Sequence, residues 1–326
     1  MNNNREKVSI IMPCYNGEKT IERAINGVIN QTYRPIELIL VNDGSTDNTH
    51  TIIQKMCHSL EYSDIEFVYI MQENMGLGGA INTGLQNITG DYIAWIDADD
   101  ELLSESTEKK VRFLQDNAQY GCVSTNAYLV NGDDWGNPIG LLTENDEINY
   151  KDEQFEYMLM SKSIFCCGCH LVRTEAFDRA NPARKIYPAR HGQNWQMLLP
   201  VYYHYKRGFI DEPLYKYGIY GTNMSAQINL MNTKKLYERR EEYIKIIHET
   251  LLHIPDMDNS FREDCEKEFK ATILEQNIYT AIENREIINY VSFMFKIIAI
   301  KKFDFHFVKY PIKMMCRRIC KLVKRG

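Results

Sequence analysis

Short apolar runs alternate with amphipathic segments through the first third of the chain. Four runs have the length of buried strands and end at turn-forming residues: 8–12, 36–41, 66–71 and 92–96. Three segments between them carry apolar residues at helical spacing: 20–30, 47–58 and 77–87. Strands separated by helices of this length predict a parallel, doubly wound α/β sheet.

Beyond residue 230 the pattern becomes helical. The segments 234–253, 261–283 and 286–300 each carry apolar residues at three- and four-residue spacing. The last segment, 303–326, interleaves aromatic and aliphatic residues with Lys and Arg. We therefore expect an α/β domain over 1–228, a helical extension over 229–302 and a basic amphipathic tail over 303–326.

Composition limits the class of protein. The chain has 326 residues, of which 44% are hydrophobic and 25% charged, as in ordinary soluble proteins. It contains no run of 18 apolar residues, so we expect no transmembrane helix. The nine cysteines follow no repeating spacing and the first residues are polar, which favours reduced thiols in a cytoplasmic protein.

The net charge of −6 conceals an asymmetry between the two ends of the chain. From Lys296 to Gly326, ten Lys and Arg residues accompany one acidic residue, Asp304, so this end carries about +9. A basic stretch with interleaved aromatic residues is typical of contact with an anionic membrane surface, here the inner face. The alternatives are a solvated tail or a homo-oligomer contact. We expect no nucleic-acid binding, because the acidic body would repel a phosphate backbone.

The most distinctive stretch is 92–100, an apolar strand that ends in Asp97, Asp99 and Asp100. Clustered carboxylates repel one another, and they persist where a divalent cation neutralises them. In an open α/β sheet, ligands bind at the C-terminal ends of the strands. The alternative is an acidic turn before a helix that Ser104 begins, with Thr107 or Glu108 completing a capping box.

The turns after the first and second strands are also polar. Tyr15 and Asn16 could stack on a base and hydrogen-bond it, or they could belong to a plain Asn-Gly turn. Asp43 ends the second strand, and we expect Asp47 to cap the following helix. The turn at 73–80 is rich in glycine, and the start of its helix suits an anion such as pyrophosphate. It is not the Gly-x-Gly-x-x-Gly pattern after a first strand, which disfavours a nicotinamide cofactor.

In order and spacing, these blocks resemble the family 2 glycosyltransferases, which have the GT-A nucleotide-sugar-binding fold. The blocks are Val8–Asn16, Gln31–Tyr33, Glu37–Asp47, Asn74–Gly76 and Gly90–Asp100. The resemblance runs to about residue 115 and continues more loosely to about 225. It implies a Rossmann-like, doubly wound, mostly parallel sheet with a nucleotide-sugar half at 1–115 and an acceptor half at 116–228, followed by the C-terminal helical extension.

The resemblance also implies roles for individual residues. Asp43 would accept a hydrogen bond from the base, and Asp97 and Asp99 match the family's Asp-x-Asp motif. Asp99 would be the direct ligand of Mn²⁺ or Mg²⁺, with Asp97 as a second ligand nearer the ribose and Asp100 sharing either task. The ion would bridge the diphosphate and offset charge on the leaving group. The residues implied to line the rest of the nucleotide pocket are Pro13, Tyr15, Asn16, Asn74 and Gly76.

The acceptor half departs from the family pattern. Inverting members use the Asp of a Glu-Asp pair as general base, and this chain has Gln193-Asn194 there, followed by Trp195. An amide cannot act as a base. The family's Tyr-Arg-x-His is likewise altered: this chain has Gly218 in place of the Arg and Tyr220 in place of the His.

Three explanations are compatible with these departures. In the first, the base is supplied by Asp100, His191 or His170, although His191 is equally well explained as a polar residue flanking a helix. Alternatively, the reaction tolerates a weak base while Gln193, Asn194 and Trp195 only orient the acceptor. In the third explanation, the domain binds a nucleotide-sugar without turning it over.

Cys166, Cys167, Cys169 and His170 suggest zinc, but no second pair of ligands accompanies them. We expect buried thiols on a strand that ends at Arg173. A nucleotidyltransferase is disfavoured, because 12–18 has neither a glycine-rich turn nor a basic residue for a triphosphate.

The sequence therefore predicts a metal-dependent, inverting glycosyltransferase. Its donor would be a nucleotide-sugar, with a UDP-sugar favoured, and its acceptor a glycan or a lipid-linked acceptor in bacterial surface polysaccharide synthesis. The alternative is a non-catalytic nucleotide-sugar-binding protein with a degenerate GT-A site.

Overall fold

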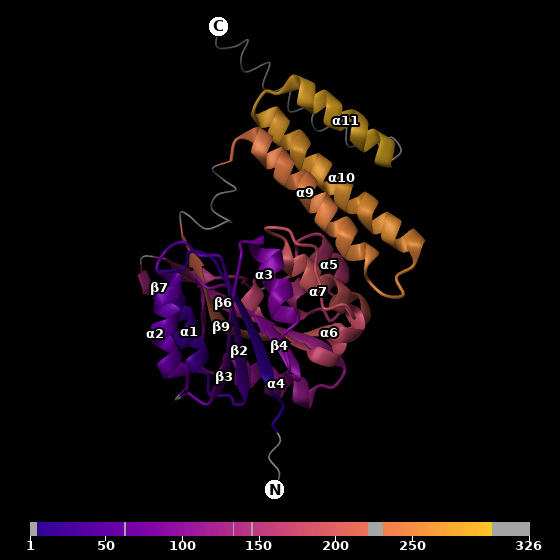
Figure 1. Ribbon diagram of the computed structural model, residues 1–326. Coiled ribbons are helices and arrows are strands. Elements are labelled where there is room, and N and C mark those ends of the chain that lie inside the picture. Colours follow the sequence, from indigo (N-terminus) through magenta and orange to yellow (C-terminus); the bar gives the residue numbers. More distant parts are fainter. Residues whose placement is uncertain (1–4, 62, 133, 145, 221–230, 302–326) are drawn as a thin grey trace. The chain divides into compact units, whose positions relative to one another are not determined.

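The computed structural model describes residues 5–61, 63–132, 134–144, 146–220 and 231–301 (Figure 1). The chain divides into two compact units. The first comprises Met1–Ala226 with Glu249–Asp256 and has a mixed α/β structure; the second comprises Gln227–His248 with Met257–Gly326 and is helical. The predicted basic tail at 303–326 lies outside the described residues.

The first unit is built on a nine-stranded sheet in the order β3-β2-β1-β4-β8-β6-β9-β5, with β7 paired to β6. The first four strands of this order run parallel, and β8 is antiparallel to β4. The strands are β1 (Val8–Cys14), β2 (Ile36–Asp43), β3 (Ile65–Gln72), β4 (Tyr92–Trp95), β5 (Glu101–Leu102), β6 (Tyr120–Asn131), β7 (Asp134–Leu141), β8 (His170–Arg173) and β9 (Lys206–Ile219). The predicted α/β fold with a mostly parallel sheet is confirmed.

Burial explains why the first strands are continuous apolar runs. Every residue of β1, β2 and β4 is buried, as expected for parallel strands that are covered on both faces. The helix α3 (Gly76–Leu85) packs on β1 and β2, while α1 (Ile21–Ile29) packs against α2 (Thr49–Glu61). At the edge of the sheet, β3 is mostly only partly buried.

The strand order creates a topological switch point beside β1. The chain passes from β1 outward through β2 and β3, and then returns to β4 on the other side of β1. Ile11 pairs with Trp95 in the register, and the Ile96 amide donates to the Ile11 carbonyl at 3.0 Å. The turns after β1 and β4 therefore leave the sheet next to each other, which is where open α/β sheets bind ligands.

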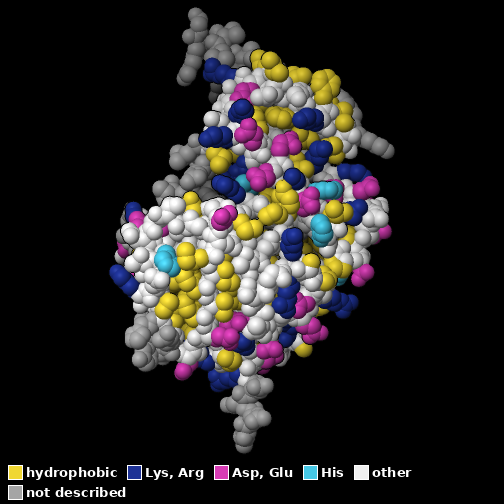
Figure 2. Space-filling view, in the orientation of Figure 1, with side chains coloured by type: hydrophobic (Ala, Val, Ile, Leu, Met, Phe, Trp, Pro, Cys, Tyr) yellow, Lys and Arg dark blue, Asp and Glu magenta, His cyan; other side chains and the backbone are white. Residues whose placement is uncertain are grey.

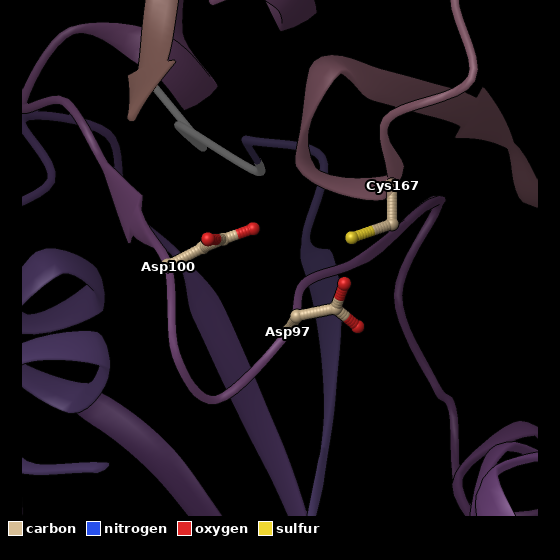
Figure 3. Close-up of side chains that lie close together, drawn as sticks. All are labelled: Asp97, Asp100 and Cys167. Carbon is tan, nitrogen blue, oxygen red and sulfur yellow. The ribbon is translucent and has the colours of Figure 1, made fainter. Parts of the chain in front are cut away.

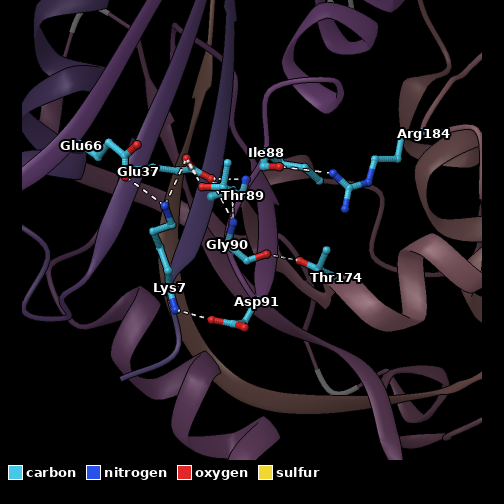
Figure 4. Close-up of polar contacts among 10 residues, drawn as sticks. Lys7, Glu37, Glu66, Ile88, Thr89, Gly90, Asp91, Thr174 and Arg184 are labelled. Carbon is cyan, nitrogen blue, oxygen red and sulfur yellow. Dashed lines mark hydrogen bonds and ion pairs between the residues drawn. The ribbon is translucent and has the colours of Figure 1, made fainter. Parts of the chain in front are cut away.

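A buried carboxylate holds the opposite edge of these strands together (Figure 4). Glu37, in β2, accepts hydrogen bonds from the Ser9 hydroxyl, from both the amide and the hydroxyl of Thr89, and from the Gly90 amide. Lys7 Nζ lies 3.7 Å from its carboxylate. Burial alone would raise the pKa of Glu37, but these donors and Lys7 leave the pKa below its ordinary value.

The remaining helices of the first unit correct two expectations. They are α4 (Ser106–Asp116), α5 (Phe155–Leu159), α6 (Thr174–Ala180) and α7 (Gln193–His204), with 3₁₀ turns η1 (Glu147–Tyr150) and η2 (Cys167–Cys169). The three cysteines are buried, as expected, and β8 ends at Arg173, but the cysteines precede this strand, with Cys167 and Cys169 in η2. Gly168 packs against the ring of Tyr215, where a Cβ would lie 2.0 Å from a ring carbon. The acidic turn also does not lead into a helix at Ser104: β5 intervenes, and α4 begins at Ser106 without a side-chain cap.

The second unit contains α9 (Thr233–Leu252), α10 (Asn259–Glu283) and α11 (Ile287–Lys301). These agree with the predicted helical segments to within two residues. Leu274 and Ile278 of α10 form a core with Phe293 and Ile297 of α11. At the turn before α11, the Glu286 carboxylate accepts hydrogen bonds from Thr233 and Tyr237 of α9. No helix among the described residues is long and apolar enough to cross a membrane.

Candidate active site

Two carboxylates and a thiol converge beyond the C-terminal end of β4 (Figure 3). Asp97 and Asp100 belong to the turn between β4 and β5, and Cys167 begins η2. One ligand atom from each of the three residues lies within 4.8 Å of the other two. The turn closes on itself, since the Asp100 amide donates to the Asp97 carbonyl at 3.2 Å.

Asp100 is buried and bonded to β9. Its Oδ2 accepts a hydrogen bond from the Tyr215 hydroxyl at 2.9 Å, and its Oδ1 accepts one from the Gly218 amide at 2.8 Å. Burial and the neighbouring Asp99 and Asp97 raise the pKa of Asp100 well above its ordinary range, and the two bonds offset this only in part. Asp100 therefore connects the acidic turn to Tyr215 and Gly218 of β9. Gly218 is one of the two positions in the Tyr-Arg-x-His block where this chain departs from the family pattern.

The other two members of the cluster are also held close to their neutral forms. Burial, followed by the charge of Asp99, raises the pKa of Asp97 to about 7, while a hydrogen bond from Cys167 opposes this rise. Burial, Asp97 and Asp100 raise the pKa of the Cys167 thiol well above its usual value. A divalent cation would relieve this concentration of acids. Two carboxylates are suitable ligands for Mn²⁺ or Mg²⁺, and the thiol adds a softer donor.

Asp99 is not part of this three-residue cluster, although the sequence predicted it as the direct metal ligand. Its backbone carbonyl accepts hydrogen bonds from Arg23 Nη2 at 2.8 Å and from the Tyr220 hydroxyl at 3.1 Å. Burial raises the pKa of Asp99 and the Arg23 guanidinium opposes the rise. Asp99 is half-buried, as Asp97 is, and its role as a metal ligand stays a prediction.

Arg23 and Trp135 are contacts of this site that sequence reasoning missed. Arg23, on α1, also donates to the Tyr220 hydroxyl at 2.5 Å, and its guanidinium carbon lies 3.5 Å from the ring centroid of Trp135 on β7. The Trp135 ring in turn stacks with Tyr220. The departure at Tyr220 was the only signal in the sequence, because the residues that surround it come from distant parts of the chain.

The turns after β1 and β2 lie against each other. The Asn16 amide donates to the Ser45 hydroxyl at 2.9 Å, and Asn16 Oδ1 accepts from the Thr46 amide at 2.8 Å. Asn16 therefore joins the two turns as well as being a candidate contact for the base. Tyr15 is 52% exposed beside it, so its ring is accessible for stacking, whereas Pro13 is buried within β1.

Asp43 is oriented by the end of β3. Its Oδ1 accepts hydrogen bonds from Gln72 Nε2 at 2.7 Å and from the Met75 amide at 2.8 Å. Asp47 accepts from the amides of Thr49 and Glu18, which confirms that it caps the start of α2 and shows that it also binds the turn after β1.

The start of α3 differs from the open anion site that the glycines suggested. The Gly78 amide donates to the Ala189 carbonyl at 2.9 Å, and a Cβ on Gly78 would lie 2.8 Å from that oxygen. The glycine is needed because the segment before α7 packs against it, so this amide is not available to a pyrophosphate. Gly76 has a φ of 76°, which glycine adopts without strain, and Asn74 is exposed. Their predicted roles in nucleotide binding are untested.

The residues that replace the family's base pair are packed inside the protein. Asn194 Oδ1 accepts a hydrogen bond from Trp95 Nε1 at 3.0 Å, and Asn194 Nδ2 donates to the Phe165 carbonyl at 3.2 Å. Trp195 is buried and its indole nitrogen donates to the Met158 carbonyl. Gln193 is buried at the start of α7. Both ends of the Asn194 amide are therefore used within the protein.

The three candidate bases differ in accessibility. His170 is fully buried, stacks on Trp95 and bonds the Ile164 carbonyl through Nε2. Burial and then the nearby cations Arg207 and Lys110 lower the pKa of His170 to about 3, so it is a neutral and enclosed imidazole. Asp100 is enclosed by β9. His191 is half-buried, just before α7.

Comparison with known sequences identifies a family. A model of the family described as Glycosyl transferase family 2 matches residues 9–180. Glycosyltransferase GlyA of Streptococcus pneumoniae is 40% identical over 103 residues, which are 32% of this chain and 14% of that protein. EpsE of Bacillus subtilis, also named as a glycosyltransferase, is 31% identical over 221 residues, covering 66% of this chain and 73% of EpsE. The chain thus spans only a small part of GlyA, and 31% of an uncharacterized glycosyltransferase of Rickettsia prowazekii.

Solved structures share the fold. Residues 1–349 of S. aureus TarS in complex with UDP-GlcNAc match with a TM-score of 0.62 and 17% identity, covering 90% of this chain and 80% of that one. Mannosyltransferase PcManGT from Pyrobaculum calidifontis in complex with GDP-Man and Mn²⁺ matches with a TM-score of 0.57 and 13% identity. The match covers 99% of this chain and 89% of that one. At these identities the likeness establishes the GT-A fold.

Proposed function

Because the chain belongs to glycosyl transferase family 2, we propose that it transfers a sugar from a nucleotide-sugar donor to a glycan or a lipid-linked acceptor. The observation that carries the proposal is the acidic turn at the switch point of the sheet. Asp97 to Asp100 follow β4 directly, and the turns after β1 and β2 that would hold the nucleotide lie beside it.

A divalent cation fits this arrangement. Asp97 would hold Mn²⁺ or Mg²⁺ together with Asp99 or Asp100, and the ion would offset the negative charge that develops on the leaving diphosphate. The raised pKa values of the three carboxylates, caused first by burial and, for Asp97 and Asp100, next by neighbouring carboxylates, agree with a site that a cation would stabilise in its ionised form. PcManGT, which shares the fold, contains Mn²⁺ in its structure.

The chain's own residues would bind and orient the donor. Tyr15 presents an exposed ring on which a base can stack, and Asp43 is held in place to accept a hydrogen bond from a base, which for uracil is its N3–H. This contact is compatible with a UDP-sugar, which is the donor that we favour. Its diphosphate would extend toward the acidic turn.

The acceptor side supports His191 as the group that takes the acceptor proton. The residue as a whole is half-buried, with its Nε2 buried, whereas His170 and Asp100 are fully enclosed and Asn194 is an amide with both ends used. Inversion at the anomeric carbon follows from the family pattern. A lipid-linked acceptor in surface polysaccharide synthesis agrees with the basic tail, which would keep the protein at the inner face of an anionic membrane.

Donor binding and hydrolysis on the purified protein test the proposal. UDP-, GDP- and dTDP-sugars are screened by calorimetry with and without Mn²⁺, and release of nucleoside diphosphate is followed over hours. We expect metal-dependent binding of one donor class and slow hydrolysis. If no donor binds under any condition, the assignment of the acidic turn is wrong.

The alternative is a protein that binds a nucleotide-sugar without turning it over. One observation favours it: the position of the family base is an amide that serves as an internal bond. Metal-dependent binding that is never followed by hydrolysis, in the wild type and at every pH between 6 and 9, would support this alternative.

A further inference from the structure

The helix α11 has two apolar faces, and the residues that the structure describes cover only one of them. Phe293, Met294 and Ile297 are buried in the core that α11 shares with α10. A second set of large apolar side chains is exposed: Ile287 is 66% exposed, Ile288 86%, Val291 43% and Phe295 70%. We call these four residues the outer face of α11.

The outer face is continuous. At about 100° per residue, positions 287, 291, 295 and 288 fall within an arc of roughly 100°, and the buried residues Phe293, Met294 and Ile297 fall within a separate arc that borders it at Met294. In Figure 2, hydrophobic side chains gather along the end of the helical unit where Figure 1 shows α11. A grouped apolar surface of this kind is typical of a docking surface, in contrast to scattered single residues.

The charge beside the outer face identifies the class of partner. Residues 287–301 contain no acidic residue, and Lys296 is exposed at the border of the face. From Lys296 to Gly326, ten Lys and Arg residues accompany one Asp, and eight of these cations belong to the chain beyond α11, which therefore carries about +7. A second copy of this chain would bring two such cationic ends together, whereas an anionic surface would neutralise them.

An anionic lipid surface fits both properties. Apolar side chains of an interfacial helix enter the boundary between headgroups and acyl chains, and lysines beside them remain at the headgroups. Lys296 Nζ lies 5.7 Å from the ring centroid of Phe293 and so remains close to the helix. Since no helix among the described residues can cross a membrane, this mode of contact is one that lies on the surface.

We propose that the outer face of α11 docks on an anionic lipid bilayer, with Ile288 and Phe295 as the main inserted side chains. The inference deepens the proposed membrane partner, because it names a folded element that inserts where the proposed function relied on the charge of the tail. It would place the transferase in the plane of a lipid-linked acceptor.

The test uses the full-length protein and vesicles of phosphatidylcholine with or without 30% phosphatidylglycerol. The double variant Ile288→Glu/Phe295→Glu should lose affinity for the anionic vesicles by at least about tenfold, because two inserted side chains become charged. The matched control is Tyr279→Glu, since Tyr279 is an exposed aromatic residue of α10, 45% exposed. Its affinity should stay within about twofold of the wild type.

A second measurement detects insertion directly. The fluorescence of Phe295→Trp should shift to shorter wavelength on anionic vesicles, and that of Tyr279→Trp should not. The proposal is overturned if the double variant binds anionic vesicles as the wild type does, or if the added Trp at 295 shows no shift. It is equally overturned if the double variant only converts a dimer to a monomer, since the occupant would then be a second copy.

Donor binding separates this inference from the proposed function. In lipid-free buffer the double variant should bind the donor found by calorimetry with wild-type affinity. If the double variant loses only vesicle binding, the result bears on the docking role of α11. If the wild type binds no donor, the transferase assignment fails and the vesicle result is unaffected.

Discussion

The indole nitrogen of Trp95 donates a hydrogen bond to Oδ1 of Asn194 over 3.0 Å. Trp95 ends β4, two residues before Asp97, and Asn194 stands in the first turn of α7. The residue at the family's base position therefore connects the acceptor half to the strand that carries the acidic turn. Its amide also bonds the Phe165 carbonyl, so the side chain is a structural link between three segments.

Replacing Asn194 with Ala should lower the free energy of unfolding by about 2–4 kcal/mol, because a buried indole N–H and a buried carbonyl lose their partner. Urea denaturation measures the change. The control is Gln193→Ala, which removes the neighbouring buried amide and should lower the free energy of unfolding clearly less. Should Asn194→Ala retain full stability while sugar transfer disappears, Asn194 would have to contact the substrate.

Replacing Asp99 with Asn should abolish the Mn²⁺-dependent part of donor binding, a loss of at least about a hundredfold in affinity, because the carboxylate would be a direct metal ligand. The fold should be unaffected, since the hydrogen bonds of Asp99 to Arg23 and Tyr220 use its backbone carbonyl. Calorimetry with and without Mn²⁺ measures the affinity. Unchanged metal-dependent binding would assign the ion to Asp97, Asp100 and Cys167 instead.

Metal-free protein should become less stable as the pH rises from about 4 to about 7. Asp97 has a pKa of about 7 when folded and an ordinary value of 3.8 when unfolded, so in this interval the folded state holds a proton that the unfolded state has released. Raising the pH therefore favours unfolding, by on the order of 4 kcal/mol, and above pH 7 the full penalty is present.

Thermal unfolding with a chelator at pH 5, 6, 7 and 8 measures this effect. Mn²⁺ should restore the melting temperature at pH 8, because the ion binds the ionised carboxylates of the folded state. Asp97→Asn should show a shallower decline and a smaller response to Mn²⁺. A wild-type curve that rises steadily through this interval would contradict the raised pKa of Asp97.

Replacing Glu37 with Gln should destabilise the protein by about 2–4 kcal/mol, because an amide cannot accept from all the donors that surround this buried position. The pKa of Glu37 is lowered in the folded state, so its contribution is present above the unfolded value of 4.5 and is lost as the pH falls below it. Glu66→Gln, which removes a neighbouring exposed partner of Lys7, is the control.

Donor affinity should not change in folded Glu37→Gln protein at pH 7.5. Glu37 contacts the residues that precede β1 and β4, at the edge of the sheet opposite the acidic turn. Chemical denaturation and calorimetry on the same sample separate stability from binding. A large loss of donor affinity would show that the two edges of the sheet are coupled.

The donor half of the fold was predictable from local pattern. Apolar runs identified β1, β2 and β4 because these strands are buried on both faces, and the helices between them have a clear apolar stripe. The helices of the second unit were predictable for the same reason. The thiols of the cysteine segment are buried, as predicted, but Cys167 and Cys169 lie in a 3₁₀ turn before β8 and not on the strand. Gly168 of this turn packs against Tyr215, a contact with a distant part of the chain that no local pattern encodes.

The sequence by itself determined the α/β alternation, the family and the acidic end of β4, because periodicity and motifs are properties of neighbouring residues. Only the tertiary structure decided that Cys167 joins Asp97 and Asp100, that Arg23 and Tyr220 hold the Asp99 carbonyl, and that Asn194 bonds Trp95. Each of these contacts joins residues that are at least 67 positions apart in the sequence, which is the separation of Asp100 and Cys167. Packing brings them together, and no local pattern encodes which distant side chains will meet.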